Sequence, residues 1–489
     1  MVSRRWVLTG LLASAAVPGC AEAPSHSPRP EARPGGGSSA ASAKTTGATG
    51  RIVEAAGLGG AVGFIVAETG SGRILDQMNA ELALPPASVA KALTGFYALD
   101  RLGAGHRFAT RVFGTGPVSN GRLAGDLVLT GSGDPSLDTD RLGDLAAALA
   151  AKGIKEISGK FYVHDGALPR IGQIDADQPV HVGYNPSISG LNLNYNRVNF
   201  EWKRGSNGYS LSMDARGKRF LPRVSMAEIK AVNRDAPLFT FKGNNTSDQW
   251  TVSAQALGKA GSRWLPVRQP DLYAAEVFST LMAAHGLRLP APIRLSSMPG
   301  GTVLAETRSE PLTEVMRDML RYSTNITAEV LGLSSSGAGS LPASGQQMSS
   351  WLAQTHGVSS HFVDHSGLGG DSRIAPAEML RALQAARGTA LPGLLREQGL
   401  RDEKGREIKN HSTRVFAKTG TLNFVSGLAG YIRPSQGKDL TFAIFSADTK
   451  RRDGLPRSER EQPQGGHQWT RRARFMQAEL LNHWAAAYT

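Results

Sequence analysis

Cysteine is almost absent from the chain, because Cys20 is the only one among 489 residues. A single cysteine excludes an intrachain disulfide and a metal site built from cysteines. The 11 histidines show no spacing typical of metal ligands, and without an H-E-x-x-H motif a zinc peptidase of that type is excluded. The chain also lacks a G-x-S-x-G motif, so the nucleophile turn of an α/β-hydrolase is not indicated.

Long basic runs interleaved with aromatic residues are also missing, and we therefore expect no nucleic-acid partner. The net charge is nevertheless +14, from 55 Lys+Arg against 41 Asp+Glu, which favours anionic partners. We interpret this charge as a solvated basic surface suited to an anionic cell envelope. Hydrophobic residues make up 40% of the chain and charged residues 20%, which is typical of a globular protein with room for two or three domains.

The apolar run at the N-terminus is too short to span a bilayer. It follows Arg4-Arg5 and predicts a signal peptide over residues 1–20. The arginine pair resembles a twin-arginine export signal, with ordinary Sec export as the alternative. Cys20 follows Val17-Pro18-Gly19, which resembles a bacterial lipobox, so lipidation would tether the protein to a membrane, whereas cleavage nearby would release it. We expect an exported protein, periplasmic or associated with the cell envelope, and either a lipoprotein or a released one.

Residues 21–50 are rich in Pro, Gly, Ser and Ala and predict a flexible, disordered linker, with order beginning near Arg51. Residues 61–66 and 74–75 predict a hairpin that leads into a helix ending at Leu102-Gly103. Further strands are expected at 108–113, 125–129, 160–164, 191–202, 209–214, 250–255, 414–418, 424–433 and 440–446. Further helices are expected at 140–151, 271–285, 311–322, 343–356, 375–387 and 467–487.

Ser88 and Ser323 both belong to motifs described below. The chain between them is too long to be an ordinary connection between two elements of one domain. We therefore expect an α+β catalytic domain that is discontinuous, formed by residues 51–104 and 288–489. Its predicted form is an antiparallel sheet flanked by helices. Residues 105–287 would form a large β-rich insertion of one or two domains.

The stretch from Pro85 to Thr94 predicts the end of a strand, a turn and a helix. Residues three apart share a helix face, so the Ser88 hydroxyl and the Lys91 amine can meet near the helix N-terminus. A serine hydroxyl is a poor nucleophile at neutral pH. Lys91 can take its proton only if burial, the helix dipole and a neighbouring positive charge keep the amine partly neutral. The pattern therefore predicts a nucleophile and its base.

Short motifs recur by chance, and Ser435-Gln436-Gly437-Lys438 also fits S-x-x-K. That copy lies in a Pro/Gly turn, where nothing would bring its lysine to its serine. Two further motifs support the first copy: Ser323-Thr324-Asn325 supplies S-x-N, and Lys418-Thr419-Gly420 supplies K-T-G on a predicted strand. The order of the three motifs resembles that of the penicillin-interacting serine enzymes.

Each of these residues also has an ordinary structural interpretation. Ser88 would be the N-cap of a helix, Ser323 and Asn325 would mark a helix end, and Lys418 would be a solvated lysine on an edge strand. Taken singly, each of these interpretations is the better one. The three motifs in this order favour catalysis.

Three longer segments extend the resemblance beyond the motifs. They are Gly125–Leu137 (GDLVLTGSGDPSL), Tyr184–Asn196 (YNPSISGLNLNYN) and Asp364–Leu368 (DHSGL). Together with the motifs they resemble the penicillin-binding protein 4 family, the D-alanyl-D-alanine carboxypeptidase/endopeptidases of peptidase family S13. The similarity covers almost everything after the linker. The chain departs from the family in a shorter helix after S-x-N, which runs quickly into Ser334-Ser335-Ser336, and in the loop after Leu368.

The resemblance implies a serine β-lactamase/transpeptidase-like fold and a role for each motif residue. Ser88 would attack the carbonyl of a penultimate D-alanine, with Lys91 as its base. Ser323 would relay a proton to the leaving amine, and Asn325 would hold the substrate amide. The remaining binding residues would be Lys418 and Thr419 at the terminal carboxylate, Gly420 beside the substrate backbone, and the Thr421 N–H, with that of Ser88, in the oxyanion hole.

The implied enzyme is a penicillin-sensitive serine-type D-Ala-D-Ala carboxypeptidase, or an endopeptidase that cuts D-alanyl cross-links. It would work through an acyl-enzyme, without metal or organic cofactor. Its partners would be peptidoglycan stem peptides and β-lactam antibiotics. The alternatives are a β-lactamase or esterase on the same fold, and a degenerate peptidoglycan-binding protein.

Asp165 follows His164 where family members carry acidic residues that can meet the amine of the peptidoglycan side chain. The resemblance therefore implies that Asp165 binds substrate. An aspartate that caps a loop is an equally good interpretation of this position.

Overall fold

The computed structural model describes residues 47–402, 405–409 and 411–489. The predicted signal peptide, Cys20 and the linker up to residue 46 lie outside these residues. Helix α1 (Ala48–Ala56) begins three residues before Arg51, where order was expected to start. The helix ends at Gly57, whose φ of 54° is the left-handed conformation that glycine adopts at low cost.

A six-stranded antiparallel sheet organises the part of the chain that carries the three motifs. Its strand order is β19-β20-β21-β22-β1-β2, so the N-terminal hairpin lies beside strands that come more than 300 residues later. The strands are β1 (Ala61–Glu68), β2 (Ile74–Met78), β19 (Arg396–Gln398), β20 (Arg414–Leu422), β21 (Val425–Arg433) and β22 (Leu440–Ala447).

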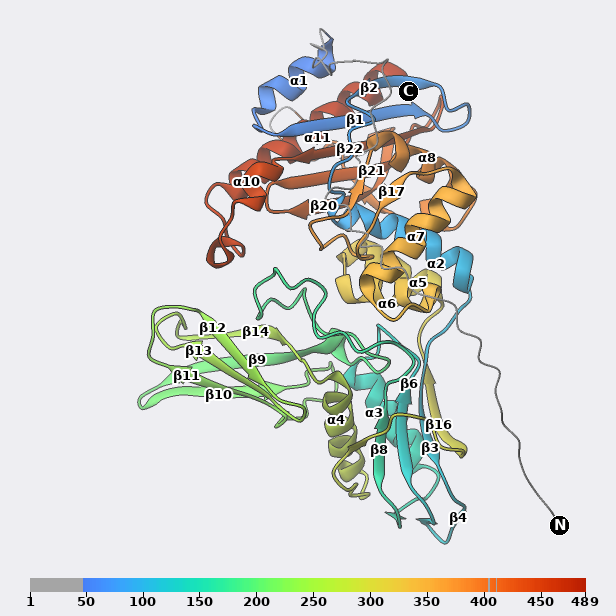
Figure 1. Ribbon diagram of the computed structural model, residues 1–489, viewed down its shortest axis with the longest axis vertical. Coiled ribbons are helices and arrows are strands. Elements are labelled where there is room, and N and C mark those ends of the chain that lie inside the picture. The colour runs from blue at the N-terminus through green and yellow to red at the C-terminus, as the bar shows by residue number, and fades with distance from the viewer. Residues whose placement is uncertain (1–46, 403–404, 410) are drawn as a thin grey trace, which may run out of the picture. The chain divides into compact units, whose positions relative to one another are not determined.

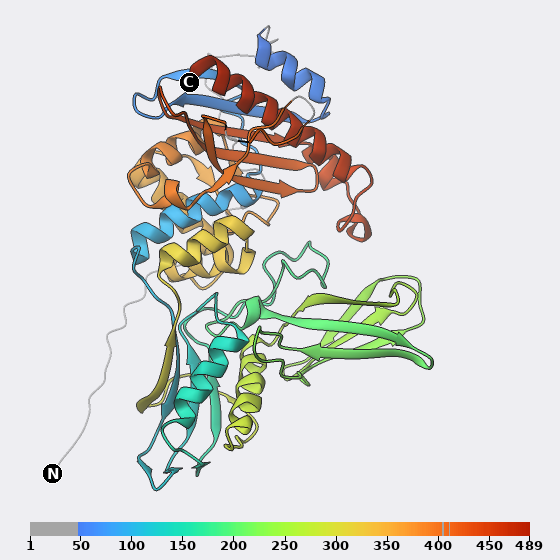
Figure 2. The same cartoon turned by 180° about the vertical axis from the view of Figure 1, so that it is seen from behind.

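Both faces of this sheet are buried, because successive side chains of a strand point to opposite faces. Phe64 and Val66 of β1 pack into one apolar core with α1 and the C-terminal helix α11 (Gly466–Tyr488). Ile65 and Ala67 pack into a second core with the central helices. Figures 1 and 2 show the sheet between these two helical layers. This arrangement agrees with the predicted antiparallel sheet flanked by helices.

The central helical layer is built around the helix that follows the first motif. That helix, α2, contacts α5, α6, α7, α8 and α9, and its first nine residues are buried. The helices are α2 (Ala90–Leu102), α5 (Leu312–Tyr322), α6 (Asn325–Ser336), α7 (Leu341–His356), α8 (Pro376–Ala386) and α9 (Leu391–Leu394). Short elements around the sheet are η1 (Ala87–Val89), β17 (Ser360–His361), β18 (Arg373–Ile374), α10 (Thr449–Asp453) and η3 (Arg457–Glu459).

The chain between α2 and α5 is rich in strands and has its own apolar core. Its largest sheet has the order β15-β8-β6-β3-β16 and packs against two helices, α3 and α4. These elements are β3 (Ala109–Gly114), β6 (Leu127–Gly131), α3 (Thr139–Ala150), β8 (Phe161–His164), α4 (Pro270–Ala284), β15 (Ile293–Arg294) and β16 (Thr302–Arg308).

Three small sheets complete this strand-rich part (Figure 1). Their orders are β10-β9-β14, β11-β13-β12 and β4-β5-β7. The strands are β4 (Val118–Ser119), β5 (Arg122–Leu123), β7 (Glu156–Ile157), β9 (Arg197–Gly205), β10 (Gly208–Asp214), β11 (Ala227–Val232), β12 (Phe239–Gly243), β13 (Asp248–Ser253) and β14 (Ala260–Pro266). A 3₁₀ turn, η2 (Asn194–Asn196), precedes β9.

The strand pairing favours a later end of the insertion than the sequence indicated. Strands β15 and β16 follow residue 287, yet β15 pairs with β8 and β16 pairs with β3. Because hydrogen-bonded strands share one sheet, these residues belong with the strand-rich part and not with the six-stranded sheet. We therefore propose that the insertion runs from about residue 105 to Arg308.

Two elements differ from their predicted bounds for identifiable reasons. The strand expected over 191–202 begins only at Arg197, because Asn194, Tyr195 and Asn196 all have positive φ angles, which a strand does not allow. Helix α6 continues to Ser336, so the helix after S-x-N is longer than the sequence indicated. Ser335 donates a hydrogen bond of 2.6 Å to the carbonyl of Leu331 within this helix.

Among the described residues, none of the helices combines the length and the apolar character needed to cross a membrane.

Candidate active site

Ser88 lies on the 3₁₀ turn η1, directly before helix α2. Lys91 is one helical turn further on, and its Nζ donates a hydrogen bond of 2.8 Å to Ser88 Oγ. The structure therefore brings together the two side chains that the S-x-x-K motif predicts on one face. In the second copy, Lys438 instead pairs with Glu68 at 3.0 Å.

The Lys91 amine is fully buried and has three hydrogen-bond acceptors. Besides Ser88 Oγ they are Asn325 Oδ1 and the carbonyl oxygen of Ser366, each at 2.8 Å. Burial, with the positive charge of Lys418 nearby, holds the pKa of Lys91 well below its ordinary value. A neutral amine has a lone pair, so Lys91 in this form can accept the proton of Ser88.

The S-x-N motif spans the junction between two helices. Helix α5 ends at Tyr322, and Ser323 follows with φ 58° and ψ 39°, a left-handed conformation that turns the chain sharply before α6 begins at Asn325. Because of this turn, Ser323 Oγ accepts a hydrogen bond from Lys418 while Asn325 Oδ1 accepts one from Lys91. The two polar side chains of the motif therefore contact the two lysines separately.

Lys418 lies on β20, next to the turn that carries Ser88. Its Nζ donates to Ser323 Oγ at 3.0 Å and to the carbonyl oxygen of Thr419 at 2.7 Å. Only 2% of Lys418 is exposed, and burial lowers its pKa to about 7. The structure thus places one buried amine at Ser88 and a second at Ser323. Lys418 is therefore not the solvated lysine of an edge strand that the ordinary interpretation gave.

Gly420 allows β20 to approach the serine turn closely. A Cβ atom at this position would lie 2.6 Å from the carbonyl oxygen of Pro86 and 3.0 Å from the backbone nitrogen of Ser88. These atoms belong to the backbone and cannot move aside without distorting the serine turn. Glycine at this position is therefore needed for contact between β20 and the serine turn, a reason that the sequence did not indicate.

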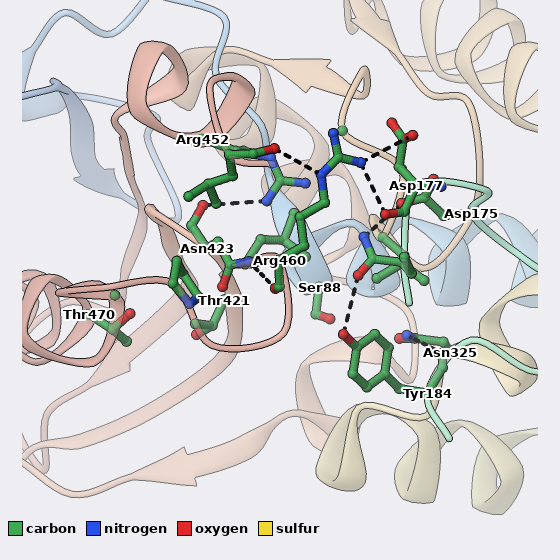
Figure 3. A pocket seen from close by; sticks show the side chains of 18 of the residues that line it. Ser88, Asp175, Asp177, Tyr184, Asn325, Thr421, Asn423, Arg452, Arg460 and Thr470 are labelled. Carbon is green, nitrogen blue, oxygen red and sulfur yellow. Dashed lines mark hydrogen bonds and ion pairs between the residues drawn. The ribbon is translucent and has the colours of Figure 1, made fainter. Parts of the chain in front are cut away.

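A cavity of about 1280 Å³ opens beside Ser88 (Figure 3). Ser323 and Asn325 of S-x-N and Thr421, which directly follows K-T-G, also line it. The cavity therefore lies where the three motifs meet. Other parts of the wall come from residues 174–178 and Tyr184 of the insertion and from residues between β22 and α11. Arg460 spans two of these walls, because its guanidinium lies 3.1 Å from the Asp177 carboxylate.

Of the predicted site residues, Ser88, Ser323, Asn325 and Thr421 line the cavity, whereas Lys91, Lys418, Thr419, Gly420 and Asp165 do not. Lys91 and Lys418 contact the lining residues from behind, but Asp165 has other partners. Its carboxylate accepts a hydrogen bond of 2.9 Å from Arg170, which also binds the buried Asp271 at 2.7 Å. Thr419 is exposed, and its carbonyl oxygen is the group that contacts Lys418.

Several residues that build the site were not identified from the sequence as site residues. Tyr184 supplies its carbonyl oxygen to Asn325 Nδ2 at 2.9 Å, and Ser366 supplies its own to Lys91. Both act through backbone atoms, which no side-chain pattern reveals. Glu329 is fully buried and accepts a hydrogen bond from the Ser366 N–H. The available signal for this residue was an acidic side chain flanked by apolar ones on a helix.

The fold, with two serines that each contact a buried lysine, defines a transpeptidase-like serine enzyme. Residues 50–465 match the model of the D-Ala-D-Ala carboxypeptidase 3 (S13) family, and the chain belongs to this family. This membership confirms the predicted family and the predicted class of enzyme, a serine-type D-Ala-D-Ala carboxypeptidase.

Relatives and a solved structure extend the match over most of the chain. The D-alanyl-D-alanine carboxypeptidase of Actinomadura sp. (strain R39) is 28% identical over 445 residues, covering 81% of this chain and 79% of that protein. The D-alanyl-D-alanine carboxypeptidase DacB of Haemophilus influenzae is 26% identical over 413 residues, covering 79% and 85%. The crystal structure of penicillin binding protein 4 from H. influenzae superimposes with a TM-score of 0.70 at 20% identity, covering 88% of this chain and 98% of that one. The last comparison confirms the predicted fold class, including its insertion.

We predict that Gly420→Ala destabilises the protein by about 1 to 3 kcal/mol, because the added methyl group collides with backbone at Pro86 and Ser88. The free energy of unfolding from urea titration measures this. Gly205→Ala is the matched control on another strand, since a Cβ there meets only one atom, at 3.7 Å. Equal stability of the two variants would show that the close approach of β20 does not constrain residue 420.

Proposed function

We propose that Ser88 is the nucleophile of a DD-carboxypeptidase and DD-endopeptidase reaction on peptidoglycan, which proceeds through an acyl-enzyme. The observation that carries this proposal is the 2.8 Å hydrogen bond between the fully buried Lys91 amine and Ser88 Oγ. Such a pair meets the geometric requirement for an activated serine, namely a base within hydrogen-bond reach of the nucleophile.

In the first half of the reaction, neutral Lys91 takes the proton of Ser88 as Oγ attacks the carbonyl carbon of the penultimate D-alanine. The backbone N–H groups of Ser88 and Thr421 bind the oxygen that becomes negative, a contribution of about 3 kcal/mol per donor in comparable hydrolases. The peptide C–N bond then breaks, and the proton passes to the leaving amine through Ser323 Oγ. Water attacks the resulting ester in the second half, with Lys91 again as base, and releases Ser88.

Substrate binding in this proposal uses the groups that face the cavity or support it. The charge of Lys418, with the Thr419 hydroxyl, attracts the terminal carboxylate of the stem peptide. Asn325 holds the substrate amide, and Gly420 leaves the strand edge open to the substrate backbone. A cross-linked peptide would be cut at the same D-alanyl bond, and β-lactams would acylate Ser88. Penicillin binding protein 4 of H. influenzae has been solved in complex with a β-lactam.

The site of action that we propose is the cell envelope, after export directed by the N-terminal segment. Arg4-Arg5 and the apolar run behind them support export, and the lipobox-like residues before Cys20 support a membrane tether through that cysteine. A basic net charge of +14 would favour contact with an anionic envelope.

We predict that Ser88→Ala lowers release of D-alanine from a pentapeptide ending in D-Ala-D-Ala by about a millionfold, as expected when a serine nucleophile is lost. Ser435→Ala removes the serine of the other S-x-x-K copy and should leave the rate unchanged. Released D-alanine is measured directly, and a digest after reaction with labelled penicillin identifies the modified residue. Full activity in Ser88→Ala would overturn the proposal. Rapid loss of the label would instead identify a β-lactamase.

The pH dependence of acylation tests the role of Lys418. Because burial lowers its pKa to about 7, the free enzyme loses the positive charge that attracts the substrate carboxylate as the pH rises through 7. We predict that kcat/KM falls above this pH. In Lys418→Arg the fall should move to higher pH, because arginine stays charged. An identical alkaline limb in both proteins would exclude Lys418 as its source.

By resemblance to the family, we propose that Asp165 contacts the amine of the substrate's side chain. Arg170 binds Oδ2 of this carboxylate at 2.9 Å, so the incoming amine would share the carboxylate with Arg170 or displace it. We predict that Asp165→Asn reduces the preference for amine-bearing over N-blocked peptides by about fivefold, which corresponds to one exposed ionic contact of roughly 1 kcal/mol. Asp144→Asn, which removes a similar pair with Arg219, is the control. Unchanged preference in Asp165→Asn would leave this residue a purely structural role.

A further inference from the structure

The third acceptor of Lys91 lies outside all three motifs. It is the carbonyl oxygen of Ser366, on the loop between β17 and β18. The direction of a buried amine is set by the acceptors around it, so the position of this carbonyl oxygen determines how the Lys91 nitrogen faces Ser88. What holds residue 366 in place therefore bears on the proposed reaction.

Two helices hold this part of the loop from opposite sides of the peptide chain. Thr94, one turn after Lys91 on α2, donates from Oγ1 to the carbonyl oxygen of His365 at 2.6 Å. Glu329 on α6 accepts hydrogen bonds from the backbone N–H groups of His365 at 2.9 Å and Ser366 at 2.8 Å, one on each carboxylate oxygen. Glu329 thus binds the N–H of the residue whose carbonyl oxygen contacts Lys91.

Glu329 is also linked to Lys91 through its own helix. Asn325, another acceptor of the Lys91 amine, lies four residues earlier on α6 and therefore on the same face. One turn of α6 thus supplies Asn325, which accepts directly from Lys91, and Glu329, which holds the residue that carries another acceptor. The loop around Ser366 tolerates little movement, because Asp364 binds the N–H groups of Gly367 and Gly369 and closes the loop on itself.

We propose that Glu329 is a positioning residue for the reaction: it holds the carbonyl oxygen of Ser366 against the Lys91 amine and so directs that amine toward Ser88. This inference rests on the proposed function, in which Lys91 is the base. Glu329 acts through this loop, since its carboxylate binds the backbone N–H groups of His365 and Ser366.

The charges around Glu329 give the proposal a second observable. The titratable groups in this buried region are Lys91, Lys418, Glu329, Asp364 and His365. The negative charge of Glu329 acts to raise the pKa of Lys91, against the larger effect of burial. Burial, with Asp364 nearby, raises the pKa of Glu329 to about 8, and burial lowers that of His365 to about 3, so His365 stays neutral.

The test is Glu329→Gln, in which the amide keeps the volume but its NH₂ group cannot accept a backbone hydrogen bond. We expect the acylation rate of Ser88 by labelled penicillin to fall by about 100-fold, the effect of misplacing a reacting group by roughly 1 Å. We also expect the pH profile of acylation to lose an ionisation near pH 8, because burial raises the pKa of Glu329 to about 8 and glutamine does not titrate. If Glu329 had a purely structural role, the substitution would change the folded fraction and leave the pH profile in place.

Glu276→Gln is a closely matched control. Glu276 likewise accepts from two consecutive backbone N–H groups, of Ser225 at 2.7 Å and Met226 at 2.9 Å, but it lies on α4 in the insertion. Its replacement should leave both the rate and the pH profile unchanged. Thr94→Val is a second variant, which releases the loop from the other side without removing a charge. It should lower the rate while the ionisation near pH 8 stays in place.

The outcomes separate this inference from the proposed function. If the wild-type protein is labelled at Ser88 and Glu329→Gln matches it in rate and pH profile, the inference is overturned and the proposed function stands. If Glu329→Gln does not fold, Thr94→Val decides, and a wild-type acylation rate in that variant overturns the inference. If the wild-type protein is not labelled at Ser88, the proposed function fails and the inference fails with it.

Discussion

The burial of one amine is the constraint on which the rest of the site depends. Lys91 is fully enclosed, and removing an ammonium group from water is costly unless its donors find partners or it loses its proton. The structure provides for both: three acceptors lie at 2.8 Å from the amine, and the charge of Lys418 nearby favours loss of the proton. These acceptors come from three separate parts of the chain, so the reactive form of Lys91 exists only in the folded protein.

The same constraint explains how the elements around the serine are packed. Strand β20 brings Lys418 close because residue 420 has no side chain, and the left-handed turn at Ser323 lets consecutive helices present two polar groups to two lysines. The insertion takes part as well, since the carbonyl oxygen of Tyr184 binds Asn325 from outside the helical layer. The insertion is therefore a component of the cavity wall as well as an addition to the catalytic fold.

The local elements around the motifs could be predicted because their patterns are local. The serine helix ends at Leu102-Gly103 as expected, and the hairpin before it and the three later strands of the sheet lie where the sequence indicated. Prediction failed where tertiary contacts override a pattern. The sequence from residue 191 is typical of a strand, but three successive residues with positive φ angles interrupt it. Strand β16 follows residue 287 but pairs with β3, a contact that no local pattern indicates.

The sequence by itself determined which side chains could react: a serine with a lysine three residues on, S-x-N and K-T-G in one order, and a family resemblance that the comparisons confirmed. Side-chain identity and short-range spacing are enough for that, because one helical turn fixes the relation of Ser88 to Lys91. Only the tertiary structure decided what surrounds them. The acceptors at Ser366 and Tyr184 are backbone atoms, and the Asp165 carboxylate binds Arg170. These contacts join chain segments that are far apart in sequence, so no local pattern could predict them.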